Sequence, residues 1–439
     1  MILGIGFGDP FTVGLIGLGC LLVLVFLGVR VVFAAAIVGL FGLVELLGWG
    51  PAAGIIGTIP HSKSSTYALS VLPMFIFIGF LAFHAGMTQQ LFDAARKWVG
   101  WVPGGLAVAT VFATAGFAAV SGASTATAAV FSRVAIPEML RYGYDKKLAA
   151  GVVAAGGTLA SLIPPSAILV IYAIIVEESV GELLLAGFLP GAVSALIYGG
   201  IIIVWALYKP QDAPSVKGYT WKERIYSLPG ISPIFIVVAI IMSAIYNGWA
   251  TPTEAGALGA TVVFGLALIR GTRMKTITAA LMESAKLTAM IFSLIWGVLI
   301  FVRFLGFSGL PEAFTSWIIS LDASPMIIMI CILIAYSVLG MFMDAIGMLL
   351  LTLPVVYPAV IALGFDSIWF GIIVVKMAEV CLITPPIGLN CFVVNGVRPD
   401  ISLTQVFRGI ALFFVADVIT IALLLRYPEI VTWLPSLMH

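Results

Sequence analysis

The chain has 439 residues, of which 62% are hydrophobic and 9% are charged, and its formal net charge is +1. With a mean hydropathy of +1.19, it has too little polar surface to be a water-soluble globular protein. The near-zero net charge also argues against nucleic acid as a partner.

Apolar stretches of about 18 to 25 residues recur along the chain, and each can cross a hydrocarbon core about 30 Å thick. We expect the first to be a retained span and not a signal peptide, because Asp9 precedes it instead of a basic cluster. We therefore expect the chain to reside in a lipid bilayer. Full spans are predicted near 11–29, 31–50, 67–86, 148–176, 183–207, 229–247, 253–270, 288–307, 367–397 and 402–426.

The stretch 104–140 does not fit two ordinary spans. After the polar patch Ser121–Ser124, few apolar residues precede Arg133. A second arm of about eight or nine residues reaches only about 12–14 Å, less than half of the hydrocarbon core. We expect a helical hairpin that enters from the cytoplasm, turns at the patch, where Gly122 permits a sharp turn, and returns. A packing seam of small residues between helices is the alternative.

The next predicted span, 148–176, is interrupted at Ser161–Ser166, which contains Pro164 and Pro165. Proline removes a helix hydrogen bond and clashes with the preceding turn. Each interruption leaves up to four carbonyl and four N–H groups without helical partners. In hydrocarbon each such group costs several kcal/mol, so a break survives only against protein, water or bound ions.

The loop 208–228 divides the chain and carries basic residues that include Lys209, Lys217 and Arg224. Because Lys and Arg gather on the cytoplasmic side of membrane proteins, we expect this linker to be cytoplasmic. The acidic connection 177–182 is expected on the outer side. Counting spans from these anchors places both termini outside.

The second half repeats this plan at a constant shift of 221 positions. A hairpin is expected over 325–363, with its turn at Gly340–Asp344, and the span 367–397 is interrupted at Leu382–Gly388. Paired interruptions in the two halves of a membrane protein point to a transporter's binding site. The matched positions are Pro137 with Pro358, Gly143 with Gly364, Asp145 with Asp366, Pro164 with Pro385 and Pro165 with Pro386.

The flanks of the second copy are acidic, and 308–324 carries Glu312 and Asp322 but no Lys or Arg. The second copy is therefore expected to open from the outside, so the two halves form an inverted repeat. We predict an all-α polytopic membrane protein with two re-entrant helical hairpins and two broken helices. The predicted domains are 1–207 (scaffold spans 11–86, hairpin 104–140, broken helix 148–176), the linker 208–228, and 229–439 (scaffold spans 229–307, hairpin 325–363, broken helix 367–397).

Helix breaks can bind ions, because carbonyl-rich C-terminal ends attract Na⁺ and helix N-termini attract carboxylate or sulfonate. Four interruptions that converge from both sides would form two cation sites with an anion site between them. Carbonyl and hydroxyl oxygens suit a hard cation. The predicted Na⁺ ligands are Ser121, Gly122, Ser124, Gly157, Ser161 and Pro164 in the first site, and Gly340, Met343, Asp344, Cys381, Thr384 and Pro385 in the second.

The predicted substrate residues are Ser124, Ser166, Arg303, Asp344 and Asn390. Arg303 could bind a carboxylate or sulfonate through two hydrogen bonds, or it could extend to the outer membrane interface. Asp344 is a functional candidate because an acid at membrane depth is costly. It also suits the N-terminal cap of the second hairpin arm, and the two roles are compatible.

Lys376 and Glu379 lie three positions apart on one predicted helix, so we expect them to form a mutual ion pair. The cysteines and histidines lack metal-ligand spacing, and no nucleophile triad is evident. The sequence therefore predicts neither an enzyme, nor a cofactor, nor a metal site other than those for Na⁺.

Eight short stretches, in their order along the chain, carry a family resemblance. They are Ser121-Gly122-Ala123-Ser124, Ile136–Met139, Gly143–Asp145, Leu162–Ser166, Leu189–Gly191, Thr251–Ala255, Gly340–Asp344 and Thr384–Asn390. In this order, and over nearly the whole chain, they resemble the large membrane subunit of a tripartite ATP-independent periplasmic (TRAP) transporter. Ala123 departs from the family, which often has Ser there, so a side-chain role at that position is in doubt.

The resemblance implies Na⁺-driven import of an organic anion, a carboxylate or sulfonate, across the bacterial inner membrane. It implies a periplasmic substrate-binding protein that delivers the anion and a small four-helix membrane subunit beside this chain. It also implies an elevator-type ion-transporter architecture, with an elevator motion of the hairpin-bearing domain against the scaffold spans. Na⁺ would be the coupling ion.

Three other functions compete with this one. A stand-alone Na⁺-coupled anion carrier would work without a binding protein. A passive anion channel would dissipate a gradient but never concentrate solute. An intramembrane enzyme would need a clustered catalytic set, and no Asp-rich or His-rich membrane motif supports one.

Overall fold

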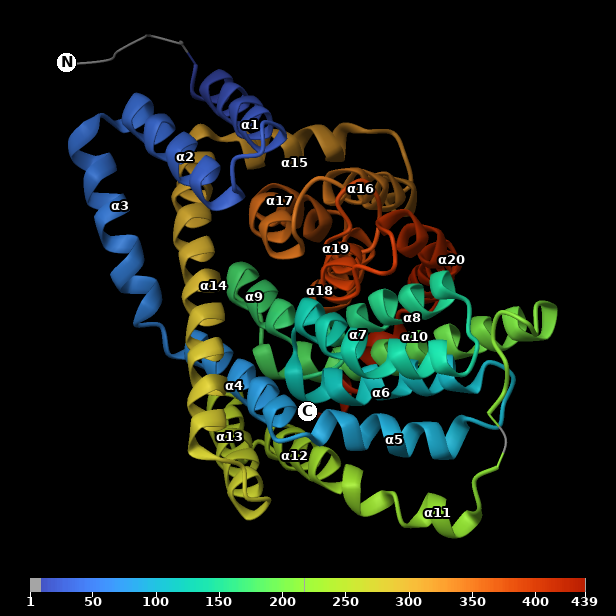
Figure 1. The fold of residues 1–439 in the computed structure, drawn as a ribbon. Coiled ribbons are helices and arrows are strands. Elements are labelled where there is room, and N and C mark those ends of the chain that lie inside the picture. The colour runs from blue at the N-terminus through green and yellow to red at the C-terminus, as the bar shows by residue number, and fades with distance from the viewer. Residues whose placement is uncertain (1–8, 217, 439) are drawn as a thin grey trace.

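The computed structural model describes residues 9–216 and 218–438, and these residues form helices and connecting turns without a β-strand. Figure 1 shows the arrangement. The helices are α1 Pro10–Phe26, α2 Val31–Leu47, α3 Trp49–Ser64, η1 Tyr67–Ser70, α4 Val71–His84, α5 Met87–Val99, α6 Gly105–Ser121, α7 Ser124–Arg141, α8 Lys146–Thr158, η2 Leu159–Ser161, α9 Ala167–Val176, α10 Val180–Tyr208, α11 Trp221–Ile225, α12 Leu228–Tyr246, α13 Pro252–Ile269, α14 Met274–Ser308, α15 Leu310–Ser320, α16 Pro325–Gly340, α17 Ala345–Ala362, α18 Ser367–Cys381, α19 Leu389–Val397, α20 Leu403–Arg426, α21 Glu429–Thr432 and η3 Pro435–Met438.

The helix bounds repeat with the sequence. Shifting the bounds of α7, 124 and 141, by 221 positions gives 345 and 362, the bounds of α17. The same shift carries the first residue of α2 onto that of α13, and the first residue of α8 onto that of α18. The fold is thus the predicted all-α inverted repeat with two hairpins and two broken helices.

Local chemistry explains why α8 and α18 start at matching positions. The Asp145 carboxylate accepts a hydrogen bond from the N–H of Lys147 (2.8 Å), and the Asp366 carboxylate accepts one from the N–H of Trp369 (2.7 Å). Both are N-terminal caps, which satisfy N–H groups that lack a partner in the first turn. Two positions before each cap, Gly143 and Gly364 have φ values of 82° and 86°, which glycine adopts without strain.

The repeats differ where α3 and α4 correspond to one long helix, α14. Between α3 and η1, the Ser65 hydroxyl donates to the carbonyl of His61 (2.8 Å) and the Thr66 hydroxyl to that of Ser62 (3.0 Å). Such local bonds compete with helix continuation. At the positions shifted by 221, α14 has Lys286 and Leu287, which favour a helix, and it runs for 35 residues.

Helix α14 lies between two groups of helices in Figure 1. It contacts α2, α3 and α4, and also α17 of the second hairpin. The hairpins and the broken helices pack with α10 and α20 into the second group. This group contains nearly all the predicted site residues.

Within the described residues, seven helices are long and apolar enough to span a bilayer, as expected of a multi-pass membrane protein. The spans predicted near 11–29 and 31–50 form α1 and α2, which are 17 residues long. The short second arm expected for the first hairpin is wrong. Helix α7 runs through Arg133 to Arg141 over 18 residues, because a charged side chain ends an apolar stretch without ending a helix.

Candidate functional site

The tip of the first hairpin lies against the first helix break. Helices α6 and α7 are separated only by Gly122 and Ala123, and the Oγ atoms of Ser124 and Ser161 are 2.7 Å apart. The backbone N–H of Ala167, at the start of α9, donates to the carbonyl of Gly122 (3.5 Å). Four of the six residues predicted for the first Na⁺ site, Ser121, Gly122, Ser124 and Ser161, therefore lie at or against one turn.

Glycine allows this close approach. Gly122 has a φ of 58°, and a Cβ atom there would collide with the carbonyl oxygen of Pro165. A Cβ atom on Gly157 would lie 2.9 Å from the carbonyl oxygen of Ser124 and 3.2 Å from Nδ2 of Asn390. The backbones of the hairpin tip and of both segments of the broken helix thus approach more closely than side chains would permit.

The break itself begins where η2 ends. The hydroxyl of Ser166 donates to the carbonyl of Ser161 (2.6 Å) and accepts from the N–H of Leu169 (3.3 Å), so it caps α9. Pro164 and Pro165 are joined by a cis peptide bond, as are Pro385 and Pro386 in the second repeat. The Ser166 side chain is occupied within the protein. Because the N–H groups of Ala167 and Leu169 already donate within the protein, few N–H groups of the first turn of α9 remain as donors for an anion.

Two side chains of the second repeat reach this site. The Ser124 hydroxyl donates to Oε1 of Glu379 (2.9 Å), and Nδ2 of Asn390 donates to the carbonyl of Ala154 (3.2 Å). Glu379 and Asn390 are fully buried, yet Oε2 of Glu379 and Oδ1 of Asn390 have no hydrogen-bond partner among the described residues. Buried acceptors without donors are rare, and a hard cation satisfies such oxygen atoms.

The second hairpin meets the second break differently. A Cβ atom on Gly340 would overlap Sγ of Cys381, so these two residues are in close contact. The Thr384 hydroxyl donates to the carbonyl of Val380 (2.6 Å), within its own turn. The Asp344 carboxylate accepts from the N–H of Gly347 (3.0 Å), which is the capping role considered for it.

The two candidate cation sites are chemically unequal. The hydroxyls of the first site correspond, after the shift of 221 positions, to apolar side chains in the second. Ligands in the second site would therefore be mainly backbone carbonyls, together with Asp344 and Thr384. The corresponding pairs are Ser121 with Phe342, Ser124 with Ala345, Ser161 with Leu382 and Ser166 with Ile387.

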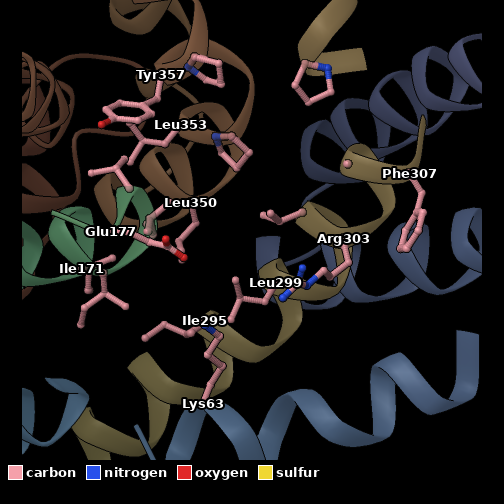
Figure 2. Close-up of a pocket in the computed structure, with 18 of the residues that line it drawn as sticks. Lys63, Ile171, Glu177, Ile295, Leu299, Arg303, Phe307, Leu350, Leu353 and Tyr357 are labelled. Carbon is pink, nitrogen blue, oxygen red and sulfur yellow. The ribbon is translucent and has the colours of Figure 1, made fainter. Parts of the chain in front are cut away.

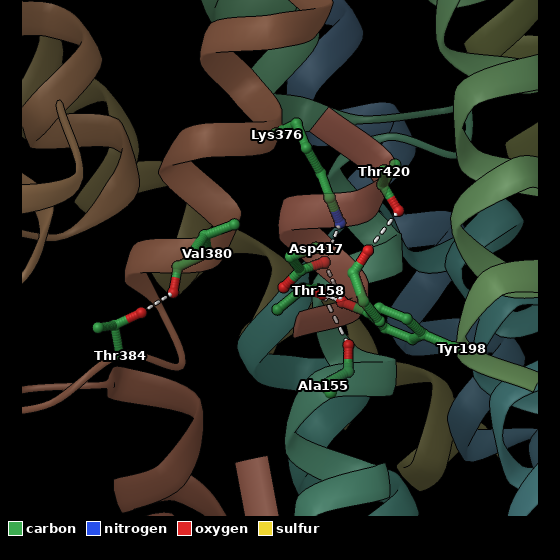
Figure 3. A network of polar contacts seen from close by, with 9 residues as sticks. Ala155, Thr158, Tyr198, Lys376, Val380, Thr384, Asp417 and Thr420 are labelled. Carbon is green, nitrogen blue, oxygen red and sulfur yellow. Dashed lines mark hydrogen bonds and ion pairs between the residues drawn. The ribbon is translucent and has the colours of Figure 1, made fainter. Parts of the chain in front are cut away.

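The mutual ion pair expected for Lys376 and Glu379 is wrong. Nζ of Lys376 lies 2.6 Å from Oδ1 of Asp417 on α20, and the hydroxyl of Tyr198 on α10 donates to the same oxygen (2.6 Å). The Tyr198 oxygen is in turn 3.2 Å from that of Thr158. Figure 3 shows this network beside the broken helix α18. Its members come from helices far apart in the sequence, which a three-residue spacing cannot predict.

Sequence reasoning missed Asp417 and Tyr198, although a signal for the first was available. Asp417 is the only charged residue between Arg408 and Arg426, in an otherwise apolar stretch. An ionisable residue within a membrane span is a functional candidate by default.

Arg303 lies apart from the other predicted substrate residues. It lines a cavity of about 580 Å³ between α9, α14 and α17, whose other charged residues are Lys63, Glu177 and Glu312. In Figure 2, Arg303 and Glu177 extend toward each other from opposite walls. The described residues that line this cavity do not include Ser124, Ser166, Asp344 or Asn390.

A smaller cavity, of about 220 Å³, reaches the hairpin tip from another direction. It lies between α4, α6, α7 and α14, and Ser121 and Ala123 line it together with Arg133. Its wall also holds His84, whose Nε2 is 3.2 Å from the Glu283 carboxylate. Residues of α14 line both cavities, together with residues of the second arm of a hairpin, α7 for this cavity and α17 for the larger one.

The chain matches a family model described as "Tripartite ATP-independent periplasmic transporter, DctM component" over residues 18–430. It is 35% identical to the C4-dicarboxylate TRAP transporter large permease protein DctM of Pseudomonas aeruginosa, over 82% of this chain and 84% of that protein. It is 30% identical to the ectoine TRAP transporter large permease protein TeaC of Halomonas elongata, over 84% of this chain and 86% of that one. It is 27% identical to the sialic acid TRAP transporter large permease protein SiaM of Vibrio cholerae, over 84% and 87%.

A solved structure shares the fold. The Alcanivorax borkumensis YdaH transporter superimposes with a TM-score of 0.56 at 12% sequence identity, covering 88% of this chain and 90% of that one. At this identity the likeness concerns the arrangement of helices alone.

Proposed function

Since the chain belongs to the DctM component family of tripartite ATP-independent periplasmic transporters, we propose that it imports an organic anion by coupling its movement to Na⁺. In this proposal a periplasmic binding protein delivers the anion, and a small membrane subunit accompanies this chain in the bacterial inner membrane. Relatives whose names specify C4-dicarboxylate and sialic acid suggest a carboxylate as cargo.

One observation carries the proposal of Na⁺ coupling. Oxygen atoms of the first hairpin tip, the first break and the second repeat converge in a buried site, and Oε2 of Glu379 and Oδ1 of Asn390 lack donors there. Na⁺ is a hard cation that binds such oxygens. The carbonyl-rich end of α8 beside them adds the negative end of a helix dipole.

The anion is expected between the two breaks. Helices α9 and α19 each begin at a break, so the positive ends of two helix dipoles lie there, although the N–H groups of Ala167, Leu169 and Asn390 already donate within the protein. Such N-termini favour a carboxylate. Na⁺ bound at the hairpin tips would order these turns and so allow the anion to bind, which makes loading of cation and anion interdependent.

Movement across the membrane is proposed to involve the hairpin-bearing helices as a unit. These helices pack with one another, while α14 packs against α2, α3 and α4. The two cavities between α14 and the hairpin arms lie at the boundary where such a motion would occur. If more Na⁺ charge than anion charge is moved, import gains about 2.3 kcal/mol per net charge per 100 mV.

The test is uptake of a labelled C4-dicarboxylate by proteoliposomes that contain the full chain with its small membrane subunit and binding protein. An inward Na⁺ gradient should drive accumulation, whereas equal K⁺ or choline should not. Uptake that is unchanged when Na⁺ is replaced would refute the coupling. The same vesicles without the binding protein distinguish the stand-alone carrier, which would transport equally well.

A further inference from the structure

We propose that Glu379 is a positioning residue of the first cation site. Its carboxylate holds the hydroxyl of Ser124 across the two repeats and provides the negative charge that a Na⁺ ion bound there would face. This inference rests on the proposed Na⁺ coupling.

The hydrogen bonds fix the direction of two hydroxyls. A serine hydroxyl has one proton and two lone pairs. Because Ser124 donates its proton to Oε1 of Glu379, the 2.7 Å contact between Ser124 and Ser161 requires Ser161 to donate to Ser124. Ser161 then keeps two free lone pairs and Ser124 one, available for a cation. Without the carboxylate, either hydroxyl could donate, and this orientation would be lost.

The charges around the Glu379 carboxylate also favour a bound cation. Glu379 is fully buried, and the nearby ammonium of Lys376 is held by Asp417 at 2.6 Å. Tyr198 donates to Asp417, and Ser124 is the hydrogen-bond donor to Glu379. When both carboxylates are ionised, two carboxylates and one ammonium leave one negative charge in the buried cluster, which a single monovalent cation neutralises. A buried charge is costly unless it is paired in this way.

The repeat argues against a purely structural role. A shift of 221 positions places Thr158, Ala155 and Leu196 where the second repeat has Glu379, Lys376 and Asp417. Helix α8 therefore forms its half of the fold without these charges. They are an addition to one repeat only, and one of them, Glu379, contacts the hydroxyl-rich cation site through Ser124.

The experiment measures Na⁺ binding apart from transport. The full chain is purified, and its melting temperature is followed as Na⁺ replaces choline at constant ionic strength. Glu379→Gln should raise the Na⁺ concentration at half-maximal stabilisation at least tenfold, and Ser124→Ala should act similarly. Because both act through one hydrogen bond, the double variant should shift the midpoint little more than the stronger single variant. Glu379→Asp, which keeps the charge, should lie between the wild type and Glu379→Gln.

A matched control lies at the other end of the same helix. Asp366→Ala removes the cap of α18 and should lower the melting temperature in both salts without moving the Na⁺ midpoint. Should Glu379→Gln behave like this control, Glu379 is merely structural and the inference is overturned. If Glu379→Gln does not fold, an unchanged midpoint in both Glu379→Asp and Ser124→Ala overturns it instead. A wild type that Na⁺ does not stabilise would remove the proposed function as well.

Discussion

Lys376 and Asp417 form an ion pair inside the helix bundle, with 2.6 Å between Nζ and Oδ1 and neither side chain more than 1% exposed. The hydroxyl of Tyr198 donates to the same carboxylate oxygen, so the pair joins α18 to both α20 and α10. Helices α10 and α20 follow the broken helix in the first and second repeat, respectively. One charge pair thus connects the second break to the closing helices of both repeats.

Replacing one member of this ion pair should destabilise the fold far more than replacing both. Lys376→Met leaves Asp417 buried without its cation, and Asp417→Asn leaves the ammonium buried without its anion. Each single change should cost about 3–5 kcal/mol of unfolding free energy. The double variant Lys376→Met/Asp417→Asn should cost much less than the sum of the two single changes. Denaturant unfolding in detergent measures the three values, and additive losses would contradict an interaction between the two charges.

Gly122 should be intolerant of any side chain. In Gly122→Ala the alanine must adopt a left-handed backbone conformation, which costs about 1–2 kcal/mol. Its Cβ atom also collides with the Pro165 carbonyl, which costs about 1–3 kcal/mol more. The hairpin tip would then separate from the break, so Na⁺-dependent uptake should fall sharply. Gly143→Ala is the matched control, because its φ is also positive but the space around it is open. Equal losses in both variants would show that strain alone, without the close approach, determines the effect.

The hairpins and breaks were predictable because local chemistry encodes them. Paired prolines cannot continue a helix, and the Gly143 and Gly364 turns precede the aspartate caps of α8 and α18. Because the same interruption recurs after a constant shift of 221 positions, it is a feature of the repeated fold and not a chance occurrence of proline. The family resemblance was carried by these same stretches.

The contacts that cross the repeats were not predictable in this way. Three-residue spacing suggested that Lys376 and Glu379 pair, but their partners, Asp417 and Ser124, lie on α20 and α7. Packing determines which face of a helix contacts which neighbouring helix. When the helices are apolar on all faces, a single sequence carries little information about these contacts. Asn390, predicted for the substrate, lies against Gly157 of the first cation site for the same reason.

Arg303 offers a test of the larger cavity. If the anion passes or binds there, Arg303→Gln should raise the KM for a dicarboxylate roughly 10- to 100-fold, since a hydrogen bond to a charged group contributes about 1.5–3 kcal/mol. The Na⁺ dependence should not change, because Arg303 lies outside the cation sites. Uptake kinetics in proteoliposomes measure both values. An unchanged KM would favour the alternative in which Arg303 serves the membrane interface.

Lowering the pH should weaken the contact between the α19–α20 loop of the second repeat and α8 of the first. In the loop between α19 and α20, Arg398 donates two hydrogen bonds to Asp400 (2.8 and 2.7 Å), and this contact lowers the pKa of the carboxyl to about 2. Lys146, at the start of α8, donates to the backbone carbonyl of Asp400 (3.4 Å). A carboxyl with a depressed pKa stabilises the fold above its ordinary pKa of about 4, and this stabilisation is lost as the pH falls toward about 2.

We therefore expect the wild type to exceed Asp400→Asn in melting temperature by a constant amount from pH 5 to 8, and the difference to vanish between about pH 4 and 2. The difference should be small, because a partly exposed ion pair contributes at most about 1 kcal/mol, and it should shrink in high salt. Melting curves of both proteins, recorded across this pH range at two salt concentrations, provide the measurement. A difference that persists unchanged at pH 2 would mean that the neutral carboxyl forms the same contacts, and that ionisation of Asp400 does not stabilise this loop.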